Sequence, residues 1–242
     1  MKTEHQQLTQ LQLYRTGEYP CNYLPEHTAS SQMVAPIDRI NDTNYGPLLD
    51  LGFRRSGLYV YRPQCAGCHA CQSYRVLTEA FTPNRSQRRC LARNADVDAR
   101  IVAPVRSDEH LALYRKYLAS RHAGGGMDDH GALEFEQFLI GAWSESRFLE
   151  LREHRTHALL AVAVTDLAAD ALSAVYTFYD PDHATRGLGT LGVLRQVEWA
   201  RRDGRSHLYL GYWIAGHPKM DYKRRFQPLE GFDGRGWRRL QA

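Results

Sequence analysis

The chain of 242 residues lacks several features that define specialised classes of protein. It has no run of about 18 apolar residues, so we expect no membrane-spanning helix and no membrane partner. Its first residues, MKTEHQQLTQ, do not place a basic segment before an apolar run, so we expect no secretory signal. It has no internal repeat and no low-complexity tract. Hydrophobic residues make up 43% of the chain and charged residues 24%, which is typical of one large or two small globular domains.

Cysteine is scarce, and its number is odd. The five cysteines are Cys21, Cys65, Cys68, Cys71 and Cys90. An odd number without a secretory signal argues against a disulfide framework and predicts a cytoplasmic protein with reduced thiols. Three of the cysteines recur at C-x-x-C spacing in CAGCHAC, residues 65–71. That spacing is typical of a metal site, an iron–sulfur site or a disulfide pair.

Lysine is also rare, whereas arginine is abundant. Of 31 basic residues only four are lysines, namely Lys2, Lys116, Lys219 and Lys223. Arginine suits phosphate because its planar guanidinium donates two parallel hydrogen bonds, although a GC-rich genome would give the same bias. The segment NRSQRRCLARN, residues 84–94, has four arginines and no acid. It predicts a helix capped by Asn84 or Ser86, with Cys90 toward the core and a basic face that is either solvated or bound to phosphate.

The first half of the chain predicts one more helix and two strands. Residues 44–52 predict a short helix that ends at Gly52. Residues 53–63 and 73–81 predict strands that flank the cysteine loop.

A composition change near residues 101–109 suggests a domain boundary, because Ser107 is a candidate helix cap followed by acids. It divides the chain into an N-terminal α/β domain with the cysteine loop, residues 1–105, and a second domain, residues 106–242.

The second half of the chain shows a more regular pattern. Helices are expected over residues 108–121 and 132–142, with a loop of three adjacent glycines between them. Three strand-like runs separated by short polar turns predict an antiparallel meander over residues 147–153, 157–166 and 171–180. A glycine-rich turn then enters a helix within residues 186–204, and a last strand covers residues 207–214.

This order of elements predicts the α+β class and resembles the core of GCN5-related N-acetyltransferases. In that fold, backbone N–H groups at the helix start hold the pyrophosphate of coenzyme A. The turn RGLGTLG is similar to the acetyltransferase turn, but Leu191 stands at its final small position.

Eight segments taken together resemble the bacterial aminoacyl-tRNA–protein transferases, which are relatives of eukaryotic arginyl-tRNA–protein transferase. The resemblance covers nearly the whole chain, and its segments are PCNYLPEHTASSQM (20–33), GFRRSGLYVYRPQCAGCHAC (52–71), FTPNRSQRR (81–89), RHAGGGMDD (121–129), YTFYDPD (176–182), LGTLGVLRQVEWAR (188–201), YLGYWI (209–214) and KMDYKRRFQPLE (219–230). One departure is Gly187, where the family commonly has serine.

The resemblance implies an N-terminal cysteine domain and an acetyltransferase-like catalytic domain. It further implies transfer of leucine from leucyl-tRNA to the α-amine of a protein that begins with Asp or Glu, which marks that protein for degradation. This reaction is aminolysis of an activated ester, and an α-amine with a pKa of about 8 is partly neutral at pH 7. Positioning alone contributes about 7–11 kcal/mol. We therefore expect direct transfer, with no cofactor required for the chemistry.

The substrates of this reaction define several subsites. Candidate tRNA-binding residues combine cations, stacking surfaces and the helix start, and they are Arg85, Arg88, Arg89, Gly189, Lys219, Tyr222, Lys223 and Arg224. A solvated basic loop is the alternative reading of residues 219–226. The acidic first residue of the target protein needs a cation, for which the candidates are Arg54, Arg55 and Arg62. Because strand neighbours point to opposite faces, at most one of the first two is expected to enter a pocket.

The leucyl ammonium needs a carboxylate, for which the candidates are Asp128 and Asp180. Tyr176, Asp180 and Tyr212 are the candidate catalytic residues, with Tyr179 as an alternative to the first. Alternation along YLGYWI places Tyr209 and Gly211 on one face and Leu210 and Tyr212 on the other. A turn role for Asp180 and core packing of the tyrosines remain the alternatives.

Within the family resemblance, Cys21 completes a set of four thiols with Cys65, Cys68 and Cys71. Four thiolates suit zinc or an iron–sulfur cluster, and likeness to the eukaryotic enzymes favours the cluster. A packed, reduced loop is the alternative. In each case we expect the loop to shape the substrate-binding domain and not to be the acyl-transfer centre.

Two other functions compete with the transferase. A coenzyme A-dependent acetyltransferase would explain the turn and the strand order. A non-catalytic protein that binds nucleic acid or metal would explain the arginines and cysteines. The eight ordered segments favour the transferase, because one fold hosts many chemistries.

Overall fold

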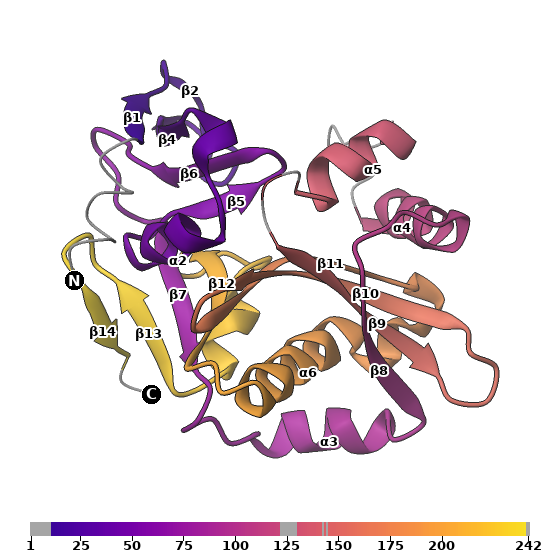
Figure 1. The fold of residues 1–242 in the computed structure, drawn as a ribbon. Coiled ribbons are helices and arrows are strands. Elements are labelled where there is room, and N and C mark those ends of the chain that lie inside the picture. The colour runs from indigo at the N-terminus through magenta and orange to yellow at the C-terminus, as the bar shows by residue number, and fades with distance from the viewer. Residues whose placement is uncertain (1–10, 122–129, 142, 144, 241–242) are drawn as a thin grey trace.

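The computed structural model describes residues 11–121, 130–141, 143 and 145–240, and it confirms a mixed α+β fold (Figure 1). A small N-terminal sheet has the order β1–β4–β6–β5, with strands Gln12–Arg15, Ser31–Ala35, Tyr59–Pro63 and Arg54–Ser56. Two further short strands, β2 (Tyr19–Pro20) and β3 (Thr28–Ala29), pair with each other. None of the helices in these described ranges is long and apolar enough to cross a membrane.

The helix expected near residue 44 is confirmed as α2, Asp42–Asp50. The side chain of Asn41 caps it by accepting hydrogen bonds from the N–H groups of Thr43 and Asn44. The single strand predicted over residues 53–63 is wrong, because the segment forms the hairpin β5–β6. Gly57, with a φ of 58°, makes the turn that separates the two strands.

The large sheet has the order β14–β13–β7–β12–β11–β10–β9–β8. Its strands are β7 Gln72–Leu77, β8 Val97–Val102, β9 Ser146–Glu153, β10 Leu159–Ala168, β11 Ala171–Tyr179, β12 His207–Trp213, β13 Leu229–Phe232 and β14 Trp237–Arg239. The predicted meander is confirmed, because β9, β10 and β11 pair antiparallel in sequence order. Strand β7 lies between β12 and β13, and β8 pairs with β9, so the sheet takes strands from both sides of residue 105.

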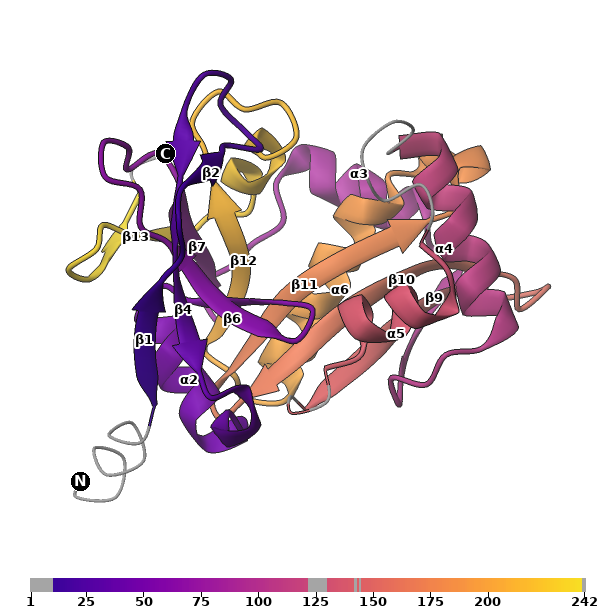
Figure 2. The same cartoon turned by 90° about the horizontal axis from the view of Figure 1, so that it is seen from above.

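Helices cover both faces of the large sheet (Figures 1 and 2). On one face lie α3 (Arg85–Arg93) and α6 (Leu188–Arg202), and on the other lie α4 (Asp108–Arg121) and α5 (Ala132–Leu139). The predicted caps are confirmed, since Asn84 accepts from the N–H groups of Ser86 and Gln87, and Ser107 accepts from that of His110. The described part of the chain also has three 3₁₀ segments, η1 Ile37–Arg39, η2 Pro181–Arg186 and η3 Asp221–Arg225.

Candidate functional site

The large sheet opens between β11 and β12. The two strands pair in parallel only from Ala171–His207 to Ser173–Tyr209, and beyond these pairs they run apart (Figure 2). Separation leaves strand carbonyls without a partner strand, and buried carbonyls need a donor. At the carbonyl of Val175 that donor is Arg54 of β5, whose Nη2 lies 3.2 Å away. A cavity of about 570 Å³ fills the opening, and we call it the sheet cavity.

The sheet cavity has a cationic lining. Four basic side chains line it, Arg54, Arg121, Lys219 and Lys223, and none of the described residues around it carries a carboxylate. They come from β5, α4 and the segment around η3, so the opening collects cations that are distant in sequence. The start of α6, at Gly187–Thr190, forms another wall and adds backbone N–H groups. This arrangement suits an anionic ligand.

Arg54 is held by a close approach to the backbone of β12. Pairing of β12 with β7 shifts register between Tyr209 and Gly211, and Gly211 has a φ of 72°. A Cβ at Gly211 would collide with the guanidinium of Arg54. The guanidinium also lies over the ring of Tyr212, 5.6 Å from Cζ to the ring centroid. Glycine is therefore needed at this position both for its conformation and for its lack of a side chain.

Lys223 is the most buried cation of the sheet cavity. Its residue is 6% exposed, and Nζ donates to the carbonyl of Tyr212. Burial, and then the positive charge of Arg54, lowers the pKa of Lys223 to about 7. Near neutral pH its amine is therefore partly uncharged and able to accept a proton.

Three tyrosines of the sheet cavity form one cluster. The ring of Tyr117 lies 4.9 Å from that of Tyr179 and 6.2 Å from that of Tyr176. Burial raises the pKa of Tyr117 to about 12 and that of Tyr176 still further, so both hydroxyls stay protonated. Arg121 donates to the hydroxyl of Tyr179 at 2.7 Å. These hydroxyls are potential hydrogen-bond donors to a ligand.

Arg55 lies outside the sheet cavity, unlike the prediction from sequence. Its guanidinium binds both carboxylate oxygens of Asp166 in β10, at 2.7 and 2.9 Å, and both side chains are fully buried. Its remaining donors bind the carbonyls of Gly57, Phe138 and Leu139. The expectation that only one of Arg54 and Arg55 faces the cavity agrees with this geometry, and the residue that faces it is Arg54.

The structure also separates Arg62 and Asp180 from the sheet cavity. Arg62 donates to Gln32 and to the carbonyl of Leu51, each at 2.8 Å, on the side of the cysteine loop. Asp180 binds Lys116 at 2.6 Å and accepts from the N–H of Asp182 at the start of η2. Burial opposes ionisation of Asp180, but the hydrogen bonds with Lys116 and Asp182 outweigh it and lower its pKa. The second ammonium candidate, Asp128, lies outside the described residues.

Tyr212 does not point where strand alternation predicts. Its hydroxyl is hydrogen-bonded to the carbonyls of Gly52 and Tyr61, at 3.0 and 2.9 Å. Tyr209 points to the same side and donates to Asp50 at the end of α2. The predicted alternation is wrong here because the irregularity at Gly211 inserts one residue between the two tyrosines.

The predicted tRNA-binding residues fall in different places. Gly189, Lys219, Tyr222 and Lys223 line the sheet cavity, and Tyr222 also lines a neighbouring cavity together with Arg89. Arg85 and Arg88 are exposed on α3 and line neither cavity. Arg224 lies over the ring of Trp213, with Cζ 5.6 Å from the ring centroid. Sequence reasoning did not identify Tyr117 or Arg121, since nothing in the pattern of α4 indicates which of its residues meet η2 and β11.

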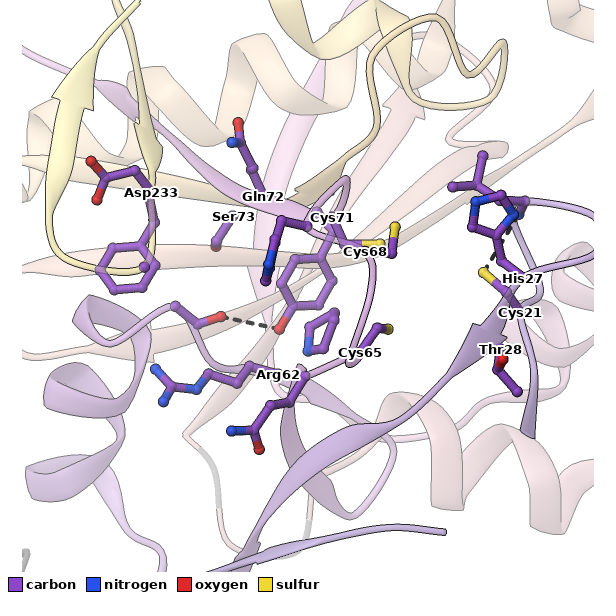
Figure 3. A pocket seen from close by; sticks show the side chains of 18 residues that line it. Cys21, His27, Thr28, Arg62, Cys65, Cys68, Cys71, Gln72, Ser73 and Asp233 are labelled. Carbon is purple, nitrogen blue, oxygen red and sulfur yellow. Dashed lines mark hydrogen bonds between the residues drawn. The ribbon is translucent and has the colours of Figure 1, made fainter. Parts of the chain in front are cut away.

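The four candidate metal ligands line one cavity of about 260 Å³, beside the loop that joins β6 to β7 (Figure 3). Burial, and then the three other thiols, raises the pKa of Cys71 to about 11. Figure 3 shows Cys21 beside His27, apart from Cys65, Cys68 and Cys71. No three His, Cys, Asp or Glu side chains of the described residues are placed to hold a metal ion. This arrangement does not fit a closed four-thiolate centre. Cys90 is buried, as predicted.

The opened parallel pair, with the start of α6 against it, confirms the expected GCN5-related acetyltransferase fold, although a fold alone does not fix the reaction. Residues 19–89 match the arginine-tRNA-protein transferase N terminus, and residues 109–233 match the corresponding C terminus. The chain belongs to the arginine-tRNA-protein transferase family, which confirms the resemblance drawn from the eight segments.

Curated relatives agree with this family. A protein of Xanthomonas campestris pv. campestris (strain B100) named aspartate/glutamate leucyltransferase is 58% identical over 236 residues, 96% of this chain and 94% of that one. One of the same name from Stenotrophomonas maltophilia (strain K279a) is 57% identical, covering 94% and 92%. Among solved structures, FemX is 10% identical with a TM-score of 0.48, covering 93% of this chain and 86% of that one. That likeness adds nothing to the family assignment.

Proposed function

We propose that this chain transfers leucine from leucyl-tRNA to the N-terminal α-amine of proteins that begin with aspartate or glutamate. The name of the 57–58% identical relatives supports this reaction. The observation that carries the proposal for this chain is the sheet cavity, with four cations and no carboxylate among its described lining residues. Such a lining attracts an acidic side chain and a phosphate-bearing donor.

Arg54 is the proposed partner of the acidic first residue. It is the arginine of the N-terminal sheet that reaches the sheet cavity, and its bond to the Val175 carbonyl fixes its position. A guanidinium binds a carboxylate through two parallel hydrogen bonds, which a target beginning with alanine cannot form. A target beginning with lysine would bring a further cation into the cavity, beside Arg54.

The same cationic lining favours leucine over arginine as the donated residue. Val175, Val193 and Leu210 line the sheet cavity and offer apolar surface to a leucyl side chain. An arginyl group would bring its charge next to the cations already present, Arg54 and Arg121 among them. The preference for leucine thus has two causes: the apolar surface fits a leucyl side chain, and the cations repel an arginyl side chain.

Lys223 is the proposed proton carrier of the transfer. The neutral α-amine of the target attacks the leucyl ester carbonyl, so that a C–N bond forms. Neutral Lys223 accepts a proton from the nitrogen, and the resulting ammonium gives it to the departing ribose oxygen as the C–O bond breaks. Tyr176, whose hydroxyl stays protonated, is the proposed donor to the developing oxyanion. Because the ester is activated, the reaction needs no cofactor.

The test is transfer of labelled leucine and, separately, labelled arginine from charged tRNA to peptides that differ only in residue one. The residues compared are Asp, Glu, Lys, Arg and Ala. Leucine on the Asp and Glu peptides alone supports the proposal. Arginine on the same peptides would keep the reaction class and overturn the donor. Acetyl transfer from acetyl-coenzyme A without tRNA would overturn the proposal in favour of an acetyltransferase.

We further propose that the reaction takes place in the cytoplasm, because it consumes charged tRNA. Its product carries an N-terminal leucine and serves as a degradation signal. Pulse–chase of a reporter that begins with Asp, in cells with and without this gene, measures that consequence. Equal half-lives in the two strains would contradict it.

A further inference from the structure

A second cavity, beside the sheet cavity, gathers four arginines. It has a volume of about 310 Å³, and we call it the arginine cavity. Its arginines are Arg89 and Arg93 from α3, Arg186 from the end of η2 and Arg225 from the end of η3. Among its described lining residues there is no carboxylate. Arg186 is paired with Asp96, and the charges of the other three arginines repel one another unless an anion lies between them.

Buried amides fix the backbone of this cluster. Gln87, 2% exposed, and Asn84 donate to the carbonyl of Arg225 at 2.9 and 3.2 Å. Asn94, fully buried, donates to the carbonyl of Arg186 at 2.9 Å and accepts from its Nε at the same distance. These side chains therefore hold the three arginine-bearing elements together, and Asn84 and Gln87 also cap the start of α3.

The arginine side chains differ in how far they are already used. Arg186 is bound to Asp96 as well as to Asn94, and Arg93 donates to the carbonyl of Thr185. Arg89 and Arg225 are exposed, and within the described chain neither forms an ion pair with a carboxylate. The guanidiniums of Arg93 and Arg186 are thus held in the wall of the cavity. Those of Arg89 and Arg225 are available to a ligand.

The arginine cavity adjoins the sheet cavity. Gly187, Thr190 and Tyr222 line both, so a ligand passing the start of α6 contacts both spaces. The acceptor end of a charged tRNA could contact both cavities in this way. Its last phosphodiester directly precedes the adenosine that carries the amino acid. If the aminoacyl group occupies the sheet cavity, that phosphodiester lies one nucleotide away. The ring of Tyr222, 41% exposed at the junction, offers a stacking surface for a base.

We propose that the arginine cavity binds the phosphodiester that immediately precedes the aminoacyl-adenosine of the donor tRNA, through Arg89 and Arg225. This inference rests on the proposed function and adds to it the place where one phosphodiester of the donor tRNA binds. Such binding, through two charge-assisted contacts of exposed side chains, is equivalent in total to about ten- to hundredfold in affinity. It also releases a counterion, which makes binding weaken as salt rises.

The test uses two donors, 2′(3′)-O-leucyladenosine and leucyl-cytidylyl-adenosine, which differ by one cytidine and the phosphodiester that joins it. For the unaltered protein, kcat/KM is expected to be about ten- to hundredfold higher with the dinucleotide. In Arg89→Ala/Arg225→Ala this preference falls toward one. The control is Arg155→Ala, an exposed arginine in the turn after β9, which keeps the preference. Circular dichroism confirms that each variant is folded.

A binding measurement distinguishes failure of this inference from failure of the proposed function. A fluorescent CCA trinucleotide is titrated against both variants at several salt concentrations. The double variant is expected to bind more weakly, with a salt slope reduced by about 0.7 for each lost contact. Equal binding and an equal donor preference in the two variants overturn the inference, even where leucine transfer from whole tRNA proceeds. Weaker binding by the double variant supports it even if no leucine is transferred. Competition by coenzyme A stronger than by CCA would also overturn it, because the cavity would then serve a different phosphate ligand.

Discussion

At the residue scale, Lys223 links the pH dependence of the reaction to burial. Because its pKa is lowered to about 7, the neutral form that accepts a proton becomes abundant as pH rises through 7. The transfer rate is expected to rise over the same range. In Lys223→Arg the group stays charged, so the rate should fall about tenfold or more and its rise should follow the target α-amine, near a pKa of about 8. Single-turnover rates from pH 6 to 9, with saturating tRNA, measure this. If the unaltered protein and Lys223→Arg gave the same pH–rate profile, Lys223 would not be the proton carrier.

Replacement of Gly211 tests whether the position of Arg54 determines selectivity for acidic N-termini. In Gly211→Ala the new Cβ collides with the guanidinium of Arg54, so the ratio of kcat/KM for Asp over Ala peptides should fall about tenfold. Gly204→Ala is the matched control, because its φ of 69° imposes similar strain while no atom lies within 4 Å of the added Cβ. Equal loss of selectivity in the two variants would mean that backbone strain, and not displacement of Arg54, is the cause.

At the scale of elements, the buried pair Arg55–Asp166 ties β5 to β10. Removing Arg55 takes its cation away from the buried carboxylate of Asp166, which costs about 3–5 kcal/mol. Arg55→Ala is therefore expected to lower the free energy of unfolding by about that amount. Arg54→Ala should change stability much less and selectivity much more. Urea unfolding of both variants makes the comparison. Full stability with lost selectivity in Arg55→Ala would instead support the role first predicted from its sequence position.

The cysteine loop gives a prediction about accessibility. Cys21, Cys65, Cys68 and Cys71 are partly exposed free thiols, whereas Cys90 is buried. A thiol reagent should thus titrate four groups in the native protein and a fifth only after denaturation. Fewer than four native thiols, together with zinc or iron in the purified protein, would indicate a metal centre in the loop. Fewer than four without metal would indicate a disulfide.

Local patterns allowed most elements to be predicted from the sequence. The caps at Asn84 and Ser107 and the meander of β9–β11 depend on neighbours in the chain, and the structure confirms them. The site was harder to predict because it depends on contacts between distant segments. Alternation indicated that one of Arg54 and Arg55 enters a pocket, but only the fold decides which face of β5 meets the opened sheet. Gly211 within a strand was a signal of irregularity that alternation alone ignored.

At the scale of the whole molecule, the N-terminal segment completes the catalytic sheet. Strand β7 lies between β12 and β13, and β8 covers the edge at β9. Arg54, which closes the sheet cavity, also comes from this segment. The two family matches thus describe halves of one site, because neither residues 19–89 nor residues 109–233 hold all the cations of the sheet cavity.

A fragment of residues 106–242 is accordingly expected not to fold alone. Without β7, strands β12 and β13 lose their shared partner, and the unpaired backbone groups of both strands would be exposed to water. The apolar surfaces of Val76 and Tyr74, fully or nearly fully buried in the intact chain, would also be missing from the core. Expression alone should give aggregated or non-cooperatively melting material, whereas co-expression with residues 1–105 should restore a cooperative transition. A cooperative thermal transition of the fragment by itself would establish residue 105 as a true domain boundary, and β7 would then be an accessory strand.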